Sequence, residues 1–371
     1  MSLEAQEQSI KREQQVEVGA EGDDDESSQS KLNRGETRKV QLTGGSTLVV
    51  SLPRDWVRSV GIRPKDEVYL VPQTDMSLLI THRAVVERSS ESVIEINSHM
   101  DEDEILRSFI AYYIAGFDVV RLRFRANLPD LRSKLKAHMR DKLIGVEIVE
   151  ETADTILTQC LHGYLDLPVK KAQGRMGILA SAMQLDAVKT LITGDLILAK
   201  EIIERDDEVD RFSHFIARQL SLAVHNRIMI QEIGLATAQD CMNYRLMAKS
   251  IERIADHAVQ IASSTILLDK RKISPPILEH IQKLSKLTNE IYENALRSVH
   301  GRSIKIANET IPKIRQVLRE EELATQGLIA SRMDNEGVVL LRLAVESLRR
   351  IAEYSVDICE IVVNLTVGSP I

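Results

Sequence analysis

Lys249-Ser-Ile-Glu-Arg-Ile-Ala-Asp-His-Ala-Val-Gln-Ile261 is the stretch of this 371-residue sequence that decides the fold of its larger half. Its apolar residues recur at the spacing that places them on one face of a helix. A second stretch later in the chain repeats it, namely Glu346-Ser-Leu-Arg-Arg-Ile-Ala-Glu-Tyr-Ser-Val-Asp-Ile358. Self-similarity of this kind indicates a duplicated helical unit.

The helical pattern extends outward from these two stretches, from residue 167 to the end of the chain. We expect all-α duplicated three-helix bundles, one at 167–272 and one at 273–371, each with a core of its own. The expected boundary is the helix-breaking pair Pro275-Pro276. Further loops are expected at Gly194, Gly234, Gly301 and Gly337.

The segment 34–83 has a different pattern, in which short β-branched runs alternate with turn residues. Two strand pairs are expected on either side of a short helix at 54–60, which begins after Pro53 and ends at Gly61. The first pair turns at Gly44-Gly45. A unit of roughly fifty residues with so little structure cannot bury a sufficient core. We therefore expect an obligate dimer with interleaved strands.

Two segments flank this β module. Residues 1–33 are polar and contain an acidic run at 23–26, which predicts a disordered acidic tail. Residues 84–166 alternate strand and helix patterns, so we expect a small α+β domain that serves as a linker or a sensing unit. Its expected strands lie at 93–96, 119–124, 146–150 and 155–160, and its expected helices at 101–114 and 130–142. The expected fold class is multidomain α+β with a helical C-terminal half.

Composition limits the setting in which the chain works. Hydrophobic residues make up 43% of the chain and the net charge is −7, so contact with nucleic acid needs a local basic patch. The three cysteines, Cys160, Cys241 and Cys359, are expected to be buried and reduced. No stretch has the length and apolar character of a membrane span or a secretion signal. These observations predict a cytoplasmic protein without membrane insertion.

Three motifs in the β module are informative about function. They are the basic strand Arg38-Lys39-Val40-Gln41-Leu42, the helix start Ser51-Leu52-Pro53, and Gly61-Ile62-Arg63-Pro64-Lys65-Asp66-Glu67-Val68. Together they resemble the swapped-hairpin SpoVT/AbrB DNA-binding domain, which implies a dimer that binds duplex DNA through its first strand and the adjacent loops. The residues that this resemblance assigns to DNA are Arg34, Arg38, Lys39, Thr43, Gly44, Gly45, Ser46, Arg54 and Arg58.

The charge of the β module agrees with this assignment. Between Lys31 and Arg83, nine basic residues stand against five acidic ones, and dimerisation doubles the excess. Clustered cations of this kind suit contacts with phosphates. The alternative is that they are ordinary solvated charges on a module that only dimerises.

Two motifs in the helical half carry a second resemblance. The helix at 250–261 has the pattern E-R-I-x-D-x-A-x-x-I, and Arg205-Asp-Asp-Glu-Val-Asp-Arg211 is close to D-D-x-I-D. Both are similar to the PhoU family of phosphate uptake regulators, and the likeness extends over 174–367. It implies metal ions, namely Fe, Zn, Mn or Mg, bound at paired carboxylates. The implied metal ligands are Asp206, Asp210, Glu252 and Asp256.

The residues themselves permit a metal site without requiring one. Carboxylates four residues apart stack on one side of a helix and repel each other unless a cation compensates. Protons are expected to compete with the metal below roughly pH 5, where ordinary carboxylates begin to protonate. The alternative is a solvated acidic face.

The second repeat departs from the first. Arg349 stands where Glu252 aligns, and Glu353 replaces Asp256. Glu353 and Asp357 are therefore the weaker metal candidates, because Arg350 on the same side already compensates part of their charge.

The two resemblances imply a homodimeric, or higher-order, DNA-binding transcriptional regulator of phosphate homeostasis, whose helical domain acts as a sensor or partner platform. Its implied partners are duplex DNA and, by analogy, a phosphate transporter's ATPase subunit or a sensor kinase. An alternative is a signalling adaptor in which the β module only dimerises and the helical surface docks these proteins. An enzyme is not expected, since the helical half has no pair of Glu-x-x-His motifs and the nine histidines suggest no catalytic arrangement.

Overall fold

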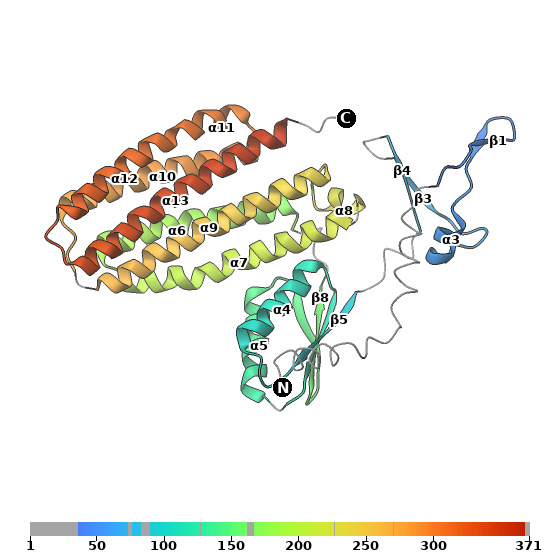
Figure 1. The fold of residues 1–371 in the computed structure, drawn as a ribbon, viewed down its shortest axis with the longest axis horizontal. Coiled ribbons are helices and arrows are strands. Elements are labelled where there is room, and N and C mark those ends of the chain that lie inside the picture. Colours follow the sequence, from blue (N-terminus) through green and yellow to red (C-terminus); the bar gives the residue numbers. More distant parts are fainter. Residues whose placement is uncertain are drawn as a thin grey trace, which may run out of the picture. The chain divides into compact units, whose positions relative to one another are not determined.

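The structure is a computed structural model that forms two compact units, Met1–Arg88 and Ser89–Ile371, each described on its own. It describes residues 36–72, 76–82, 90–126, 128–161, 167–225, 227–269 and 271–367. The acidic tail expected at 1–33 lies outside these ranges. Figure 1 follows the helices and strands along the chain.

The first unit consists of two hairpins separated by a short helix, as the sequence predicts. Strand β1 (Gln41–Thr43) pairs antiparallel with β2 (Thr47–Val49), and β3 (Tyr69–Pro72) pairs antiparallel with β4 (Leu78–Thr81). Between the pairs lies α3 (Arg54–Val60), which ends in a left-handed residue.

The described part of this unit has no core within one chain. None of the side chains described between residues 36 and 82 is buried. Leu42 and Leu48, which face each other across the first hairpin, are 65% and 71% exposed. Burying one such side chain stabilises a fold by about 1.5–3 kcal/mol, so a unit that leaves them all in water lacks its main driving force. The described hairpins therefore expose the apolar surface that the expected dimer would bury.

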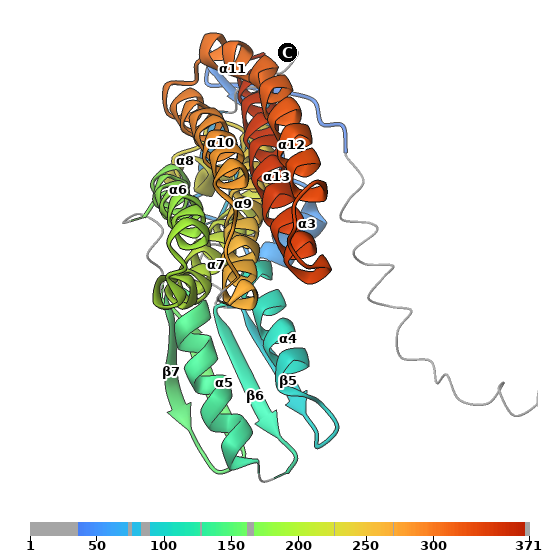
Figure 2. The ribbon, with the colours of Figure 1, turned by 90° about the vertical axis from the view of Figure 1, so that its left-hand side faces the viewer.

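The second unit begins with an α+β domain. Its four-stranded sheet has the order β5-β6-β8-β7, in which β5 runs parallel to β6 and the other neighbours are antiparallel. Two helices cover one face of the sheet (Figure 2) and bury Ile96, Leu122 and Ile156 beneath them. The elements are β5 (Glu91–Ile96), α4 (Glu102–Ala115), β6 (Val119–Phe124), α5 (Pro129–Lys142), β7 (Val146–Glu151) and β8 (Thr155–Cys160).

The rest of the unit is helical. The two repeats each contribute three long helical segments, and the middle segment of the second repeat is broken into shorter pieces. The loops expected at Gly194, Gly234 and Gly301 lie at helix ends. The elements are α6 (Val169–Thr193), α7 (Leu196–His225), α8 (Arg227–Glu232), α9 (Ala238–Leu268), α10 (Pro275–Gly301), α11 (Ile304–Thr310), the 3-10 helix η2 (Ile311–Lys313), α12 (Ile314–Ile329) and α13 (Asn335–Thr366).

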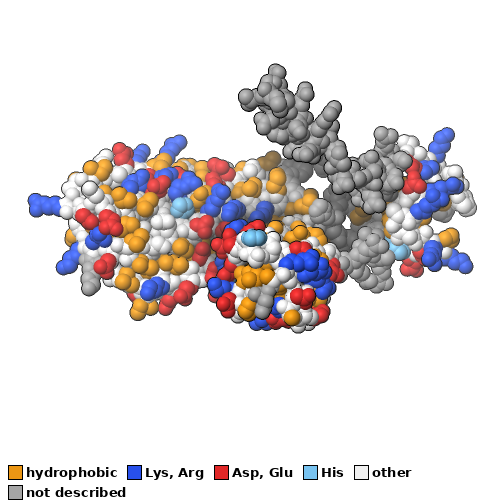
Figure 3. Space-filling view, turned by 60° about the horizontal axis from the view of Figure 1, so that its bottom comes forward, with side chains coloured by type: hydrophobic (Ala, Val, Ile, Leu, Met, Phe, Trp, Pro, Cys, Tyr) orange, Lys and Arg blue, Asp and Glu red, His pale blue; other side chains and the backbone are white. Residues whose placement is uncertain are grey.

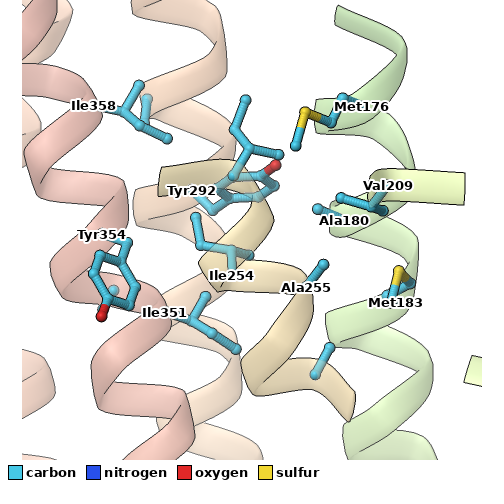
Figure 4. Close-up of a cluster of buried hydrophobic side chains, with 14 of the residues drawn as sticks. Met176, Ala180, Met183, Val209, Ile254, Ala255, Tyr292, Ile351, Tyr354 and Ile358 are labelled. Carbon is cyan, nitrogen blue, oxygen red and sulfur yellow. The ribbon is translucent and has the colours of Figure 1, made fainter. Parts of the chain in front are cut away.

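Two expectations about this half are wrong. Gly337 is not in a loop but is buried in the first turn of α13, where a Cβ would come within 2.6 Å of the Met333 sulfur. The glycine instead lets the preceding loop pack tightly over the helix. The two repeats also share one core rather than two, because α9 and α13 pack against each other along the middle of the bundle. Figure 4 shows side chains from both repeats meeting there, and the Tyr292 hydroxyl of α10 donates to the Gly177 carbonyl oxygen of α6 at 2.9 Å.

A buried arginine joins the α+β domain to the bundle. Arg218 of α7 is 1% exposed and donates to the carbonyl oxygens of Tyr113 at 2.6 Å and Phe117 at 2.8 Å. It also forms an ion pair with Asp118 at 3.0 Å. Cationic side chains are favourable at a helix C-terminus, and Arg218 meets the last carbonyls of α4 there. Together with the packing of α4 and α5 against α7, this contact holds the domain and the bundle in one unit.

Two further expectations concern thiols and membranes. The three cysteines are free and buried, as predicted. Within the described ranges, no helix has the length and apolar character needed to cross a membrane.

Candidate functional site

The four carboxylates of the first repeat come together on two adjacent helices. Asp206 and Asp210 lie on α7, and Glu252 and Asp256 lie on α9, which packs along it. Desolvation and the neighbouring carboxylates raise the pKa of Asp206 to about 7 and that of Asp210 to about 6. The pKa of Asp256 is raised for the same two reasons. We call these four residues the acidic cluster.

The members of the acidic cluster differ in how they are held. Glu252 accepts a hydrogen bond from Ser213 Oγ at 3.0 Å and pairs with Lys249 Nζ at 2.6 Å. Asp206 has no such support, because its Oδ1 is buried and has no hydrogen-bond partner. A buried polar atom without a partner costs about 1–3 kcal/mol. Asp206 is therefore the member of the acidic cluster that has a buried carboxylate oxygen without a compensating donor.

The donor set suits a hard cation. All four side chains offer carboxylate oxygens, which Mg²⁺, Mn²⁺ and carboxylate-bound iron accept. The orphaned Asp206 oxygen is the kind of atom that a cation would satisfy. Among the described residues, however, no three His, Cys, Asp or Glu side chains are gathered closely enough to hold a metal as they stand. The residues thus fit a metal by charge and chemistry, but they do not form a ready-made site.

The equivalent place in the second repeat is already neutralised. Arg349, which stands where Glu252 aligns, forms ion pairs with Glu353, with Glu346 at 3.5 Å, and with Glu321 of α12 at 3.1 Å. Glu353 also pairs with Arg350 at 2.6 Å. A guanidinium thus occupies the position that would need a metal ion, so Glu353 is a poor ligand. Asp357 remains exposed, and desolvation and Glu360 raise its pKa.

The described residues that are assigned to DNA are all exposed on the first unit, and Figure 3 shows Lys and Arg side chains on the surface of that unit. Arg38 pairs with Glu36, whereas Lys39, Arg54 and Arg58 are exposed and have no acidic partner among the described residues. Their charges are therefore available to a polyanion. Arg34 lies outside the described ranges.

The turn between β1 and β2 is exposed along its whole length, from Thr43 to Ser46. Gly44 and Gly45 have φ values of +62° and +88°, and nothing stands within 4 Å of a Cβ built on either. Both glycines are thus required by backbone conformation and not by lack of space. A bare turn of this kind lets a nucleic-acid backbone approach closely.

Arg218 and Ser213 are important residues that the sequence interpretation missed. The signal for Arg218 was present, because it interrupts the run Phe215-Ile-Ala-Arg-Gln-Leu220, in which every side chain is buried. An arginine in such a run is rarely buried without a partner. Ser213 gave no local signal, since its partner Glu252 lies on another helix.

The fold and these sites define the class of protein: a small, charged hairpin module with no buried side chain among its described residues, joined to a duplicated helical bundle that carries a partly compensated acidic cluster. Residues 174–265 match the family model of the PhoU domain. Residues 41–86 match the model described as "Antidote-toxin recognition MazE, bacterial antitoxin". The chain thus has a segment similar to the MazE/AbrB type followed by a segment similar to the PhoU domain, which confirms both resemblances expected from the sequence.

Individual relatives match about half of this chain. One is "Phosphate-specific transport system accessory protein PhoU homolog 1" of Thermotoga maritima, 24% identical over 54% of this chain and 86% of the relative. The corresponding PhoU homolog of Pseudomonas aeruginosa is 25% identical over 53% of this chain and 81% of the relative. Among solved structures, PhoU from Pseudomonas aeruginosa aligns with a TM-score of 0.49 at 24% identity, covering 54% of this chain and 96% of that one. PhoU from Streptococcus pneumoniae aligns with a TM-score of 0.47 at 19% identity, covering 55% and 95%.

Proposed function

We propose that this protein is a homodimeric DNA-binding transcriptional regulator of phosphate uptake, and not an enzyme. The observation that carries the proposal concerns the first unit. Lys39, Arg54 and Arg58 are exposed without an acidic partner among the described residues, and none of the side chains described in this unit is buried. Dimerisation would bury the exposed apolar residues and place two copies of the basic strand on one particle. Paired basic surfaces are what contacts with duplex phosphates require.

The helical domain supplies the sensing function in this proposal. Relatives that match it are named as accessory proteins of phosphate-specific transport, which supports a role in phosphate homeostasis. Asp206, Asp210, Glu252 and Asp256 would hold a cation, and the ion would supply the positive charge that the acidic cluster lacks. A phosphate transporter's ATPase subunit or a sensor kinase would be its protein partner.

The DNA-binding step is tested with the full-length protein and a double substitution, Arg38→Ala with Lys39→Ala. The wild type should bind duplex DNA with a steep salt dependence, a slope of roughly −0.9 per phosphate neutralised, and the variant should bind far more weakly. Lys286→Ala with Arg319→Ala removes the same charge from exposed positions on the bundle, so it should bind like the wild type.

The same titration separates the two candidate functions. Weak binding by the wild type, without a steep salt dependence, would show that the β module only dimerises. The protein would then be a signalling adaptor that works through its helical surface.

A further inference from the structure

The two edges of the four-stranded sheet differ in how they are protected. The β7 edge has an irregular register between Ile148 and Glu150 and carries acidic side chains. Bulges and charges are the usual means by which proteins keep an edge strand from pairing with another chain. The β5 edge keeps an unbroken register with β6 over all six residues from Glu91 to Ile96, without proline or lysine. Among the strands that the structure describes, none pairs with the outer edge of β5, so this edge can accept a further strand.

The hydrogen bonds of β5 show which peptide groups face the open edge. The Ser90 carbonyl oxygen accepts from Val119 N–H at 3.0 Å, and the Ile96 carbonyl oxygen accepts from Arg125 N–H at 2.9 Å. Even-numbered residues therefore direct their peptide groups toward β6. Because the direction alternates along a strand, the N–H and C=O groups of the odd-numbered residues Glu91, Val93 and Glu95 point to the open edge.

We propose that β5 pairs antiparallel with β5 of a second copy of this chain, so that one continuous sheet runs across the homodimer. In one register, every N–H and C=O group of Glu91, Val93 and Glu95 forms a hydrogen bond with the second copy. This register places Val93 opposite its own copy and Glu91 opposite Glu95 of the partner subunit, and each facing pair exchanges two hydrogen bonds. The strand is thus complementary to itself, as a two-fold interface requires.

The charges on the open face of the sheet permit this register. Glutamates that face each other across two strands normally repel. Here Glu91 is already paired with Arg121 at 3.0 Å, and Glu95 is paired with Arg123 at 2.8 Å and Arg125 at 2.7 Å. Each copy brings three arginines for two glutamates, so the facing carboxylates would be compensated.

A second copy is favoured over another protein by the chain itself, and this step rests on the proposed homodimer. Only the short stretch 82–90 separates β4 of the first unit from β5. If the hairpin modules dimerise, the two β5 strands are tethered to one another. A short tether gives an effective concentration in the millimolar range. Even a weak strand pairing would then form.

The test uses hydrogen exchange in the full-length protein with Val93→Pro. Proline removes only the N–H that points to the open edge, so it should leave the pairing of β5 with β6 intact. In the wild type, the amides of Glu91 and Glu95 should exchange at least about tenfold more slowly than expected for a solvated edge. In Val93→Pro they should exchange rapidly, while Ile94 and Ile96 stay protected. The matched control, Val93→Ala, should retain slow exchange.

Sedimentation of the same samples separates this proposal from the proposed dimer. A dimeric wild type whose Glu91, Val93 and Glu95 amides exchange as fast as free edge amides would overturn strand pairing and leave the hairpin dimer standing. A monomeric wild type would overturn both. Slow exchange at Glu91 and Glu95 that persists in Val93→Pro would also refute the pairing, since the protection would then have another source.

Discussion

Asp206 determines how the metal-free protein should respond to pH. Its pKa is raised from 3.8 to about 7, so the folded state holds a proton that the unfolded chain releases near pH 4. The contribution of protonated Asp206 to the free energy of unfolding should therefore be fully present below about pH 4 and should be lost as the pH rises to about 7. We expect a loss on the order of 2 kcal/mol between pH 5 and pH 7.5, measured by urea unfolding with a chelator present. Asp206→Asn should abolish most of this slope, whereas Asp103→Asn, an exposed position on α4, should leave it unchanged.

Cation binding to the acidic cluster should oppose that loss. At a free metal concentration about 100-fold above the dissociation constant, the stabilisation is about 2.7 kcal/mol. Because Asp206 and Asp210 must be ionised, affinity should already fall below about pH 7, not only below the pH 5 expected from ordinary carboxylates. Glu252→Gln with Asp256→Asn should lose the metal-dependent rise in melting temperature. Elemental analysis without bound metal, together with no thermal shift from Fe, Zn, Mn or Mg, would leave a solvated acidic face.

Arg349 is the residue that distinguishes the second repeat from the first. Arg349→Glu would leave Glu321, Glu346 and Glu353 facing a further carboxylate. Breaking a fully buried ion pair costs about 3–5 kcal/mol. Because Arg349 is partly solvated, we expect a destabilisation nearer to about 2 kcal/mol, with partial recovery when Mn²⁺ is added. Arg349→Gln, which removes the charge without adding another, should be destabilised less and should not respond to the metal. Equal stability of Arg349→Glu and the wild type in urea would show that the ion-pair network contributes nothing.

At the scale of elements, Arg218 couples α7 to the C-terminus of α4. Arg218→Met keeps the length of the side chain and removes its donors, so the Tyr113 and Phe117 carbonyl oxygens and Asp118 lose its hydrogen bonds. Removing one partner of a buried pair costs about 3–5 kcal/mol. We expect the single unfolding transition of residues 89–371 to split into two, with the α+β domain unfolding first in calorimetry. Gln219→Met, at the next residue of the helix, removes only the hydrogen bond from Gln219 Nε2 to the Leu167 carbonyl oxygen at 2.9 Å and should keep one transition.

The elements themselves could be predicted from the sequence because their signals are local. The helix at 54–60, with proline before it and glycine after it, has the expected bounds, and all four strands of the α+β domain were anticipated within two residues of their ends. Pairing of the carboxylates followed from their helical spacing. The shared core and the role of Gly337 could not be predicted, since both depend on contacts between α9, α13 and a distant loop. The support of Glu252 by Ser213 likewise arises only when two helices pack.

At the scale of the whole molecule, the two units should behave differently as fragments. A 34–83 fragment should be folded only as a dimer, because no described side chain in it is buried within one chain. A fragment of 89–371 should fold without it, since it has its own cores. NMR of the short fragment across a dilution series checks this prediction. A well-dispersed spectrum from a monomer would contradict the argument from burial.

The central claim is regulation of phosphate uptake through DNA, and genome-wide mapping of bound sites in the native cell tests it most directly. The wild type should occupy a limited set of sites near genes for phosphate transport, with occupancy that changes between phosphate-rich and phosphate-poor growth. The Arg38→Ala with Lys39→Ala protein, present at the same level, should lose these sites, and the Lys286→Ala with Arg319→Ala control should keep them. A wild-type map that shows no enriched sites in either condition, or the same map from the Arg38 and Lys39 variant, would contradict the claim.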